Sequence, residues 1–531
     1  MPAPTRQRQL APHLPVPTHA RAAAPRCFAT ARGVLVCALC VVLAGCGGGE
    51  PATTARGPGP LPTRLADVSG AFRIAGVAAG LRGRVTLSLN EGFDSVVVGQ
   101  AGSFAFGRRL AAGQRYEVRV ASQPPGQSCE VLGGSGIADA DVEGLQLRCR
   151  EGSPQSVHAL GAAMGGAGNA SALVEDAQGR LFALTRNGGA HGQGAVIRIA
   201  ADGAASVLHS FDGGAMDEEP QRLGLGPDGN LYGVATLDER HPHGVVFRLS
   251  PQGAYSVVHE FDDEVDGSSP SSPLLLAGDG RFYGLTGTGG RHGGGTLYRF
   301  LPHSGRVEVV HAFRDVQALQ QRDPDRTCDS DGEADARVDD LYSPAGQLAE
   351  DPRTRTLYGT AIEGGMHGQG GVFGYALQSR TLRTVASIPD DFPSPSYGLV
   401  RTRAGELFGV LQRADEPLAM FRVQTDGRLR VYRWRERDHV PRVPRGVLAE
   451  GSDGRLYGIS ELGGEHAAGA LYSFDPGGGS ALLHHSFGEP GDPSRVGAYP
   501  ASSPLITRAD VIHGITGAGG PHGDGVVFRI R

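Results

Sequence analysis

The sequence predicts an all-β protein: a seven-bladed β-propeller preceded by a small β-sandwich domain and a lipoprotein leader. Three observations lead to this prediction. A short strand core recurs seven times within residues 155–531, at intervals of about 50 residues. Residues 67–150 alternate apolar and polar side chains between glycine-bearing turns. Residues 1–45 contain a hydrophobic run and are followed by a cysteine.

The leader is expected to be a secretory signal. Its apolar run, Val34 to Ala44, follows several arginines, ends in small residues and is too short to span a bilayer comfortably. Residues 43–46 read LAGC and resemble the bacterial lipobox, in which the leader is cut before the cysteine and the thiol is diacylated. We therefore expect lipidation at Cys46. The alternative is an ordinary cleaved signal that contains a cysteine.

A lipid on Cys46 would make the membrane one partner of the protein. Residues 46–66, rich in glycine and proline, then act as a flexible tether. Glycine rather than aspartate follows the cysteine, which favours the outer membrane of a bacterial cell envelope as the location. The formal net charge of −6 and the dispersed basic residues argue against nucleic acid as a partner.

Three cysteines lie beyond Cys46. Cys129 and Cys149 fall in one small predicted domain, and an exported protein permits disulfides, so we expect them to pair. Cys328 is then unpaired. We interpret it as a spare thiol rather than a nucleophile, because no repeated pattern places a base beside it.

Residues 67–150 are expected to form the sandwich. Short segments alternate with period two and are separated by turns that contain glycine. The predicted strands include Val85–Leu89, 95–98, 103–106 and Tyr116–Val120.

The repeat region is built on a core of the form LYG, which precedes a VFR-type strand and a third strand of the form SVLHSF. The cores are Leu181–Ala183, Leu231–Gly233, Phe282–Gly284, Leu357–Gly359, Leu407–Gly409, Leu456–Gly458 and Ile512–Gly514. One copy of the third strand, at 156–160, precedes the first core. Pairing it with residues 526–531 would close a ring of seven blades and remove two unpaired edges. A linear β-solenoid, or six or eight blades, are the alternatives.

The repeat unit resembles a known family. Its pattern, LYG-x-T-x-x-GG-x-HG-x-G-x-VF-R, is best preserved at 282–300 and 357–373. This resembles the choice-of-anchor tandem repeat GloVer-containing proteins. The resemblance implies a bacterial, exported and anchored protein, and implies little about activity. The unit at 407–423 lacks the GG-x-HG segment.

Two histidine series repeat along the chain. Imidazole is the commonest metal ligand, so histidines around a central channel would suit a cation; the alternative is that each serves its own blade. The first series is His191, His243, His292, His367, His466 and His522. The second is His158, His209, His259, His311 and His485.

An acidic insertion at 323–340 is the one candidate calcium loop. Its carboxylates are Asp325, Asp329, Asp331, Glu333 and Asp335. Alternate oxygen ligands with a glycine suit calcium, but the bidentate glutamate of the full loop pattern is missing, so a solvated acidic loop is the default. No other cofactor is expected.

No pattern of catalytic residues emerges. The sequence contains no G-x-S-x-G elbow, phosphate loop, H-E-x-x-H or zinc-spaced cysteines. We expect a non-catalytic module in which a face of the propeller binds a protein or glycan. The alternative is a metal-dependent hydrolase or lyase with its site in the central channel.

Overall fold

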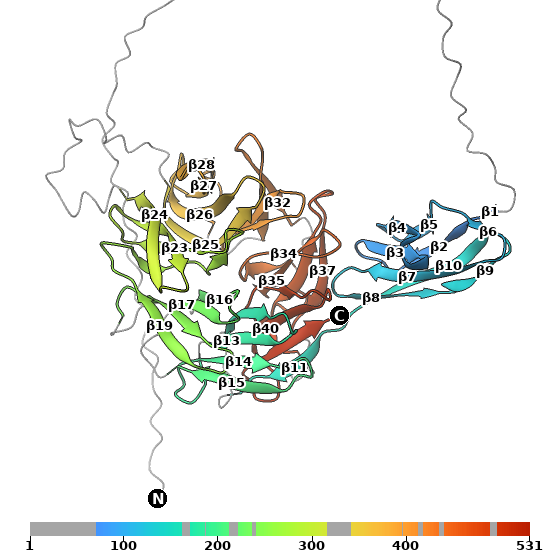
Figure 1. Cartoon of the computed structure of the whole chain (residues 1–531), viewed down its shortest axis with the longest axis horizontal. Helices are drawn as coiled ribbons and strands as arrows, with labels where there is room; N and C mark the ends of the chain where they lie inside the picture. The colour runs from blue at the N-terminus through green and yellow to red at the C-terminus, as the bar shows by residue number, and fades with distance from the viewer. Residues whose placement is uncertain are drawn as a thin grey trace, which may run out of the picture. The chain divides into compact units, whose positions relative to one another are not determined.

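The structure is a computed structural model, and the parts of the chain that it describes are all-β (Figure 1). They are residues 71–161, 170–185, 187–211, 221–235, 241–315, 341–395, 397–411, 418–434, 440–488 and 496–531. The leader, Cys46, the tether and the acidic insertion, with Cys328, Asp325, Asp329, Asp331, Glu333 and Asp335, lie outside these ranges. Within them, no helix has the length and apolar character that a membrane crossing requires.

Residues 71–151 form two four-stranded sheets and one short strand pair. The sheet orders are β5-β2-β10-β8 and β4-β3-β7-β9, and β1 pairs with β6. The strands are β1 (Ala71–Phe72), β2 (Ile74–Ala79), β3 (Val85–Leu89), β4 (Asp94–Val98), β5 (Gly102–Ala105), β6 (Leu110–Ala111), β7 (Gln114–Ser122), β8 (Gln127–Leu132), β9 (Ser135–Ala138) and β10 (Val142–Glu151).

Both sheets contribute to one hydrophobic core. Ile74 on β2 and Leu147 on β10 pack with Leu87 on β3 and Val118 on β7, and all four are buried. The alternation of apolar and polar residues explains this, since successive side chains of a strand point to opposite faces. The pairing of β2 with β10 is parallel, whereas the other strand pairs described in this part are antiparallel.

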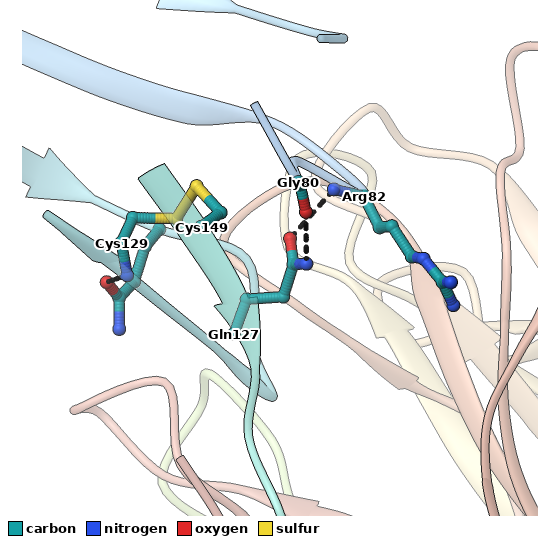
Figure 2. Close-up of a disulfide and its surroundings, with 6 residues drawn as sticks. Gly80, Arg82, Gln127, Cys129 and Cys149 are labelled. Atoms are coloured by element: carbon teal, nitrogen blue, oxygen red, sulfur yellow. Dashed lines mark hydrogen bonds between the residues drawn. A yellow bond between two sulfur atoms is a disulfide. The ribbon is translucent and has the colours of Figure 1, made fainter. Parts of the chain in front are cut away.

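Cys129 and Cys149 are joined by a disulfide, as the sequence predicts (Figure 2). They lie directly opposite each other on β8 and β10. The fully buried Gln127 connects β8 to the segment that follows β2. Its side chain accepts a hydrogen bond from the N–H of Arg82 at 2.8 Å and donates one to the carbonyl of Gly80 at 2.9 Å. Closing a loop of this length contributes about 3 kcal/mol to stability.

Residues 155–531 form seven antiparallel sheets in the parts of the repeat region that the structure describes. We number them in chain order. Sheet 1 has β12 (Ala170–Glu175), β13 (Leu181–Thr185), β14 (Ala195–Ile199) and β15 (Ala205–Ser210). Sheet 2 has β16 (Gln221–Leu225), β17 (Leu231–Ala235), β18 (Val245–Leu249) and β19 (Tyr255–Glu260). Sheet 3 has β20 (Ser268–Pro270), β21 (Leu275–Leu276), β22 (Phe282–Thr288), β23 (Gly293–Leu301) and β24 (Arg306–Arg314).

Sheet 4 has β25 (Leu341–Asp351), β26 (Thr356–Gly364), β27 (Gly371–Ala376) and β28 (Thr381–Ser387). Sheet 5 has β29 (Leu399–Arg401), β30 (Leu407–Leu411), β31 (Ala419–Val423) and β32 (Leu429–Arg433). Sheet 6 has β33 (Arg442–Pro444), β34 (Ala449–Glu450), β35 (Leu456–Leu462), β36 (Ala470–Phe474) and β37 (Ala481–Ser486). Sheet 7 has β11 (Gln155–Ala159), β38 (Ala498–Pro500), β39 (Leu505–Ile506), β40 (Ile512–Ala518) and β41 (Val526–Ile530).

The final sheet is completed by the first strand of the repeat region. β11 pairs antiparallel with β41, and the partners include Ser156 with Phe528 and His158 with Val527. The predicted pairing of residues 156–160 with 526–531 is therefore confirmed. It gives β41 a neighbour on the side where it would otherwise present unpaired backbone groups.

Buried hydrophobic clusters join each sheet to the next. Sheets 1 and 2 share one cluster that includes Phe211 and Phe247, and comparable clusters join sheets 2 and 3, 3 and 4, 4 and 5, 5 and 6, and 6 and 7. A further cluster packs Ile515 and Val527 of sheet 7 against Ile197 of sheet 1. Each sheet thus buries both faces. This explains why the strand of the LYG core and the VFR-type strand after it are apolar almost throughout.

Candidate functional site

The repeated glycine of the LYG core faces an aromatic ring on the next strand. The direct cross-strand pairs are Gly233 with Phe247, Gly284 with Tyr298, Gly359 with Phe373, Gly409 with Phe421, Gly458 with Tyr472 and Gly514 with Phe528. In each pair the ring occupies the space that a Cβ on the glycine would need. The repeated glycine and the repeated aromatic residue are therefore one structural device.

Sheet 1 departs from this pattern on both strands at once. Ala183 replaces the glycine, and its direct partner is Ile197 rather than an aromatic residue. Both side chains are fully buried. The smaller partner makes room for the extra methyl group, so the two changes compensate each other sterically.

The last glycine of the GG-x-HG-x-G segment packs against the following sheet. A Cβ on Gly244 would lie 2.5 Å from Cδ of Pro270, and a Cβ on Gly295 would lie 2.8 Å from Cδ of Pro344. Gly469 has the same relation to Pro500. All three glycines have positive φ, between 88° and 108°. This position therefore serves contact between neighbouring sheets.

The residue before each of these prolines has an unusual backbone. Ser269, Ser343 and Tyr499 have φ values of 55°, 53° and 54°. Val443, which precedes Pro444 in sheet 6, has a φ of 52°. Side chains with a Cβ avoid this region, a β-branched valine most of all. This backbone conformation allows a hydrogen bond to the preceding sheet in two cases. In sheet 3 the N–H of Ser269 donates to the carbonyl of His243, and in sheet 7 the N–H of Tyr499 donates to the carbonyl of Ala468. These hydrogen bonds offset part of the strain, and the sequence analysis did not find this device.

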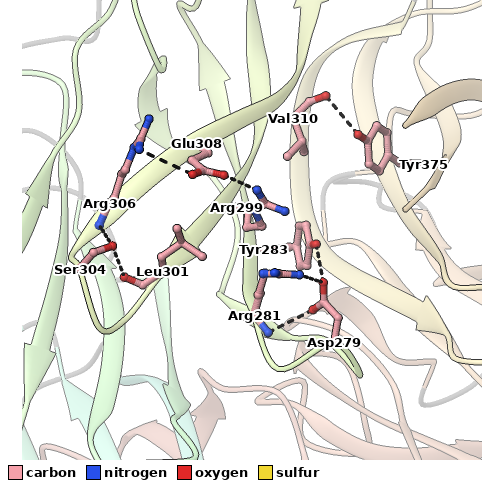
Figure 3. Close-up of polar contacts among 10 residues, drawn as sticks. All are labelled: Asp279, Arg281, Tyr283, Arg299, Leu301, Ser304, Arg306, Glu308, Val310 and Tyr375. Carbon is pink, nitrogen blue, oxygen red and sulfur yellow. Dashed lines mark hydrogen bonds and ion pairs between the residues drawn. The ribbon is translucent and has the colours of Figure 1, made fainter. Parts of the chain in front are cut away.

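At the opposite end of the core strand, an aspartate holds the preceding turn. The Tyr283 hydroxyl donates to Asp279 at 2.9 Å, as shown in Figure 3, and Tyr232 donates to Asp228 at 2.8 Å. Burial and the nearby Asp279 raise the pKa of Tyr283 to about 12. Burial alone would raise the pKa of Asp279, but hydrogen bonds from Tyr283 and Arg281 hold it below its usual value. The hydrogen bonds of this carboxylate therefore stabilise the turn.

The same end of sheet 3 carries an ion-pair network (Figure 3). Arg299 on β23 pairs with Glu308 on β24, and this lowers the pKa of Glu308. Arg306 lies 3.9 Å from the same carboxylate. The Tyr375 hydroxyl, from sheet 4, donates to the carbonyl of Val310 at 3.3 Å. Each of these side chains has at least one partner, although Nε of Arg299 has no hydrogen-bond partner among the described residues. We assign the network to stability.

The repeated histidines lie on the third strands and in the GG-x-HG loops, not on the channel. Four of the third-strand histidines contact the phenylalanine two residues further on, edge to face: His209–Phe211, His259–Phe261, His311–Phe313 and His485–Phe487, at 4.7–5.1 Å between ring centroids. His259 also lies 2.7 Å from Asp266. Across the described residues, no group of three or more histidine, cysteine or acidic side chains is placed to hold a metal.

Burial lowers the pKa of several histidines, two in the repeated series and two outside it. It lowers the pKa of His311 to about 4, with His292 as a second cause. It lowers the pKa of His485 to about 4 in the same way, with His466 nearby. The pKa values of His484 and His513 are also lowered to about 4, chiefly by burial and then by a neighbouring arginine. Neutral imidazoles fit a role in packing within each sheet.

A central cavity of about 430 Å³ is the candidate site. Sheets 1, 2, 3, 4, 6 and 7 all contribute residues to its wall. Its lining includes Val174, Leu225, Leu275, Ala449 and Leu505, with Gln347 and Ser503 as the polar side chains. A cavity of this size with an apolar wall and few polar groups is typical of a binding site.

This lining bears on the metal-dependent alternative. Among the described residues that line the cavity, none is histidine, cysteine, aspartate or glutamate. Such side chains are the usual ligands of catalytic metals and the usual acids and bases. The described wall therefore supplies no observation in favour of a hydrolase or lyase.

Comparisons with known proteins identify the family to which the repeat region belongs. The family model for the Gloeobacter/Verrucomicrobia repeat matches residues 146–332 and 356–531. No curated protein matches the chain. Similar solved structures include a gluconolactonase of Xanthomonas campestris, 16% identical, with 63% of this chain and 90% of that chain covered and a TM-score of 0.34. Another is TolB of Acinetobacter baumannii, 13% identical, with 57% and 63% covered and a TM-score of 0.35.

Proposed function

Because the chain belongs to the Gloeobacter/Verrucomicrobia repeat family, we propose that it is an exported, lipid-anchored β-propeller that binds a protein or glycan without catalysing a reaction. Its seven sheets are the seven blades of a closed ring. The cluster that packs sheet 7 against sheet 1, together with the pairing of β11 and β41, supports this closure. A closed ring leaves no sheet at an end with an uncovered apolar face.

The apolar central cavity is the observation that carries the binding role. Where the repeated residues are present, their side chains or backbones already have structural contacts. Glycines pack against rings or prolines, aspartates accept from tyrosines, and histidines pack against phenylalanines. Function then falls to residues that do not repeat, at the cavity and on the loops around it. Loops on a rigid scaffold suit recognition, because the scaffold holds them in place at little entropic cost.

A charge placed in the cavity tests this role. Leu275→Arg puts a guanidinium into the apolar wall, and we expect it to weaken binding by about tenfold or more. The full chain would be immobilised and exposed to purified bacterial envelope polysaccharides and envelope proteins. Val309→Arg, at a position 38% exposed on β24, is the matched control and should bind as the unaltered chain does. Equal binding by both variants would contradict the proposal. A stoichiometric metal held by three side chains in the central channel would favour the alternative, a metal-dependent hydrolase or lyase.

Anchoring is the second part of the proposal. Lipidation of Cys46 would hold the chain at the membrane, with residues 46–66 as the tether. In a Gram-negative bacterial host, Cys46→Ala should move the protein from the membrane to the soluble envelope fraction and abolish acyl mass on the mature N-terminal residue. Cys328→Ala is the control. Retention of Cys46→Ala in the outer-membrane fraction would contradict anchoring through this residue.

A further inference from the structure

Sheet 5 departs from the repeat in its outer strand. In four other sheets this strand ends in His-x-Phe, as at 209–211 and 485–487. In sheet 5 the corresponding residues are Tyr432, Arg433 and Trp434, and Trp434 is the chain's single tryptophan. Tyr432 pairs directly with Met420, just as His209 pairs with Val196 in sheet 1. The sheet that lacks the GG-x-HG segment therefore also carries a different pair of aromatic residues.

These aromatic residues line a pocket of about 110 Å³ between sheets 5 and 6. Its wall consists of Met420, Tyr432, Arg433 and Trp434 from sheet 5, and Phe474, Gly479, Ser480 and Ala481 from sheet 6. Tyr432 contacts Phe474 at 4.8 Å between ring centroids, and Trp434 packs edge-on against Tyr472 at 6.0 Å. The rings belong to the buried cluster that joins the two sheets, so the wall is held rigidly.

Two polar atoms in this wall are buried without a hydrogen-bond partner among the residues that the structure describes. They are the Tyr432 hydroxyl and Nε1 of Trp434. A buried polar atom left unpaired destabilises the folded chain, so two beside one pocket call for an explanation. An indole N–H can only donate, and a tyrosine hydroxyl can donate as well. The missing partner must therefore supply hydrogen-bond acceptors.

A positive charge lies beside these donors. Arg433 contributes to the pocket wall, but its guanidinium lies over the ring of Phe392, at 5.1 Å from the centroid. Arg430 lies over the ring of Tyr432, at 5.0 Å from its centroid. Asp475 belongs to the same turn as Gly479, but its carboxylate accepts the N–H of Gly477 and does not line the pocket. Guanidinium groups disfavour a cationic guest in the aromatic walls and favour an anionic one.

We propose that this pocket binds a small carboxylate with a compact apolar body. The carboxylate oxygens accept from the Tyr432 hydroxyl and the Trp434 N–H, while the apolar body contacts Met420 and Phe474. Arg430, which lies over the Tyr432 ring, compensates the charge. This site is distinct from the central cavity and does not depend on the binding role proposed for it.

Isobutyrate is a suitable probe, because it joins a carboxylate to an isopropyl group. It would be titrated into the full chain while the fluorescence of Trp434 is recorded, with sodium chloride at equal concentration as the reference. For a probe of this size we expect a Kd in roughly the millimolar range. Isobutyramide should bind more weakly, and isopropylammonium should not bind.

Tyr432→Phe removes one donor and keeps the ring. We expect it to raise the Kd for isobutyrate about fivefold or more while leaving the unfolding midpoint unchanged or higher, because an unpaired hydroxyl is lost. Tyr499→Phe, at an exposed tyrosine in sheet 7, is the matched control and should not change the Kd. Three results would each overturn the proposal: no response to isobutyrate up to about 50 mM, well above the expected Kd; tighter binding of isopropylammonium; or an unchanged Kd in Tyr432→Phe.

Discussion

Gly233→Ala is expected to destabilise the repeat region by about 3 kcal/mol or more. The new Cβ would lie 2.7 Å from Cε1 of Phe247, whose side chain is fully buried and has no room to move. Guanidinium unfolding of the full chain, followed by circular dichroism, measures the loss. Phe247→Ile introduced together with Gly233→Ala recreates the pair found at Ala183 and Ile197 in sheet 1. The double variant should therefore recover about 2 kcal/mol relative to the sum of the two single variants.

Gly229→Ala is the control for this experiment. Gly229 lies in the same sheet with φ of 78°, and nothing lies within 4 Å of its added Cβ. It should lose only the cost of a left-handed backbone, about 1–2 kcal/mol. If Gly233→Ala costs no more than this control, or if the double variant shows no coupling, the steric account of the LYG glycine is wrong.

Acidification is expected to unfold the repeat region well before its carboxylates are all protonated. The pKa values of His311, His484, His485 and His513 are lowered to about 4 in the folded chain, from an ordinary value of 6.5. The unfolded chain therefore binds protons first, and stability is lost as the pH falls from 6.5 towards 4. At pH 5 each group costs on the order of 2 kcal/mol. Asp453, whose pKa is raised by burial, offsets a part of this loss.

Unfolding free energies at pH 7.5 and pH 5 provide the measurement. His513→Gln keeps a polar side chain but removes one titrating group, so it should reduce the difference between the two pH values by about 2 kcal/mol. His303→Gln, at an exposed histidine, should leave the difference unchanged. A stability that is equal at both pH values would show that these imidazoles do not stay neutral in the folded chain.

Much of the fold could be read from periodicity. The segment predicted as a strand at Val85–Leu89 is β3, and the third-type strand at 206–211 corresponds to β15, Ala205–Ser210. The first strand of sheets 3, 6 and 7 is divided into two short strands. In sheet 3 it is split into β20 and β21, with Ser269 at positive φ just before the break. No local pattern marks that break, because its cause is a proline that packs against a glycine in another sheet.

The candidate sites were less accessible to prediction. The disulfide of Cys129 and Cys149 was predicted because both lie in one small domain of a chain expected to be exported, and it is present. The histidine series attracted attention because they repeat, yet the structure places them on outer strands and loops. Tyr432 and Trp434 would have been found by asking where the His-x-Phe pattern is replaced rather than where it is kept.

The amino-acid sequence by itself determined which segments are strands, how many times the unit recurs, and which strand from the start of the repeat region completes the last sheet. These depend on alternation and repetition, which are local properties of the chain. Only the tertiary structure decided which residues face the central cavity, why each glycine is needed, and which buried donors lack a partner. Those properties arise where residues about 50 positions apart meet between neighbouring sheets, and strand periodicity carries no information about that contact.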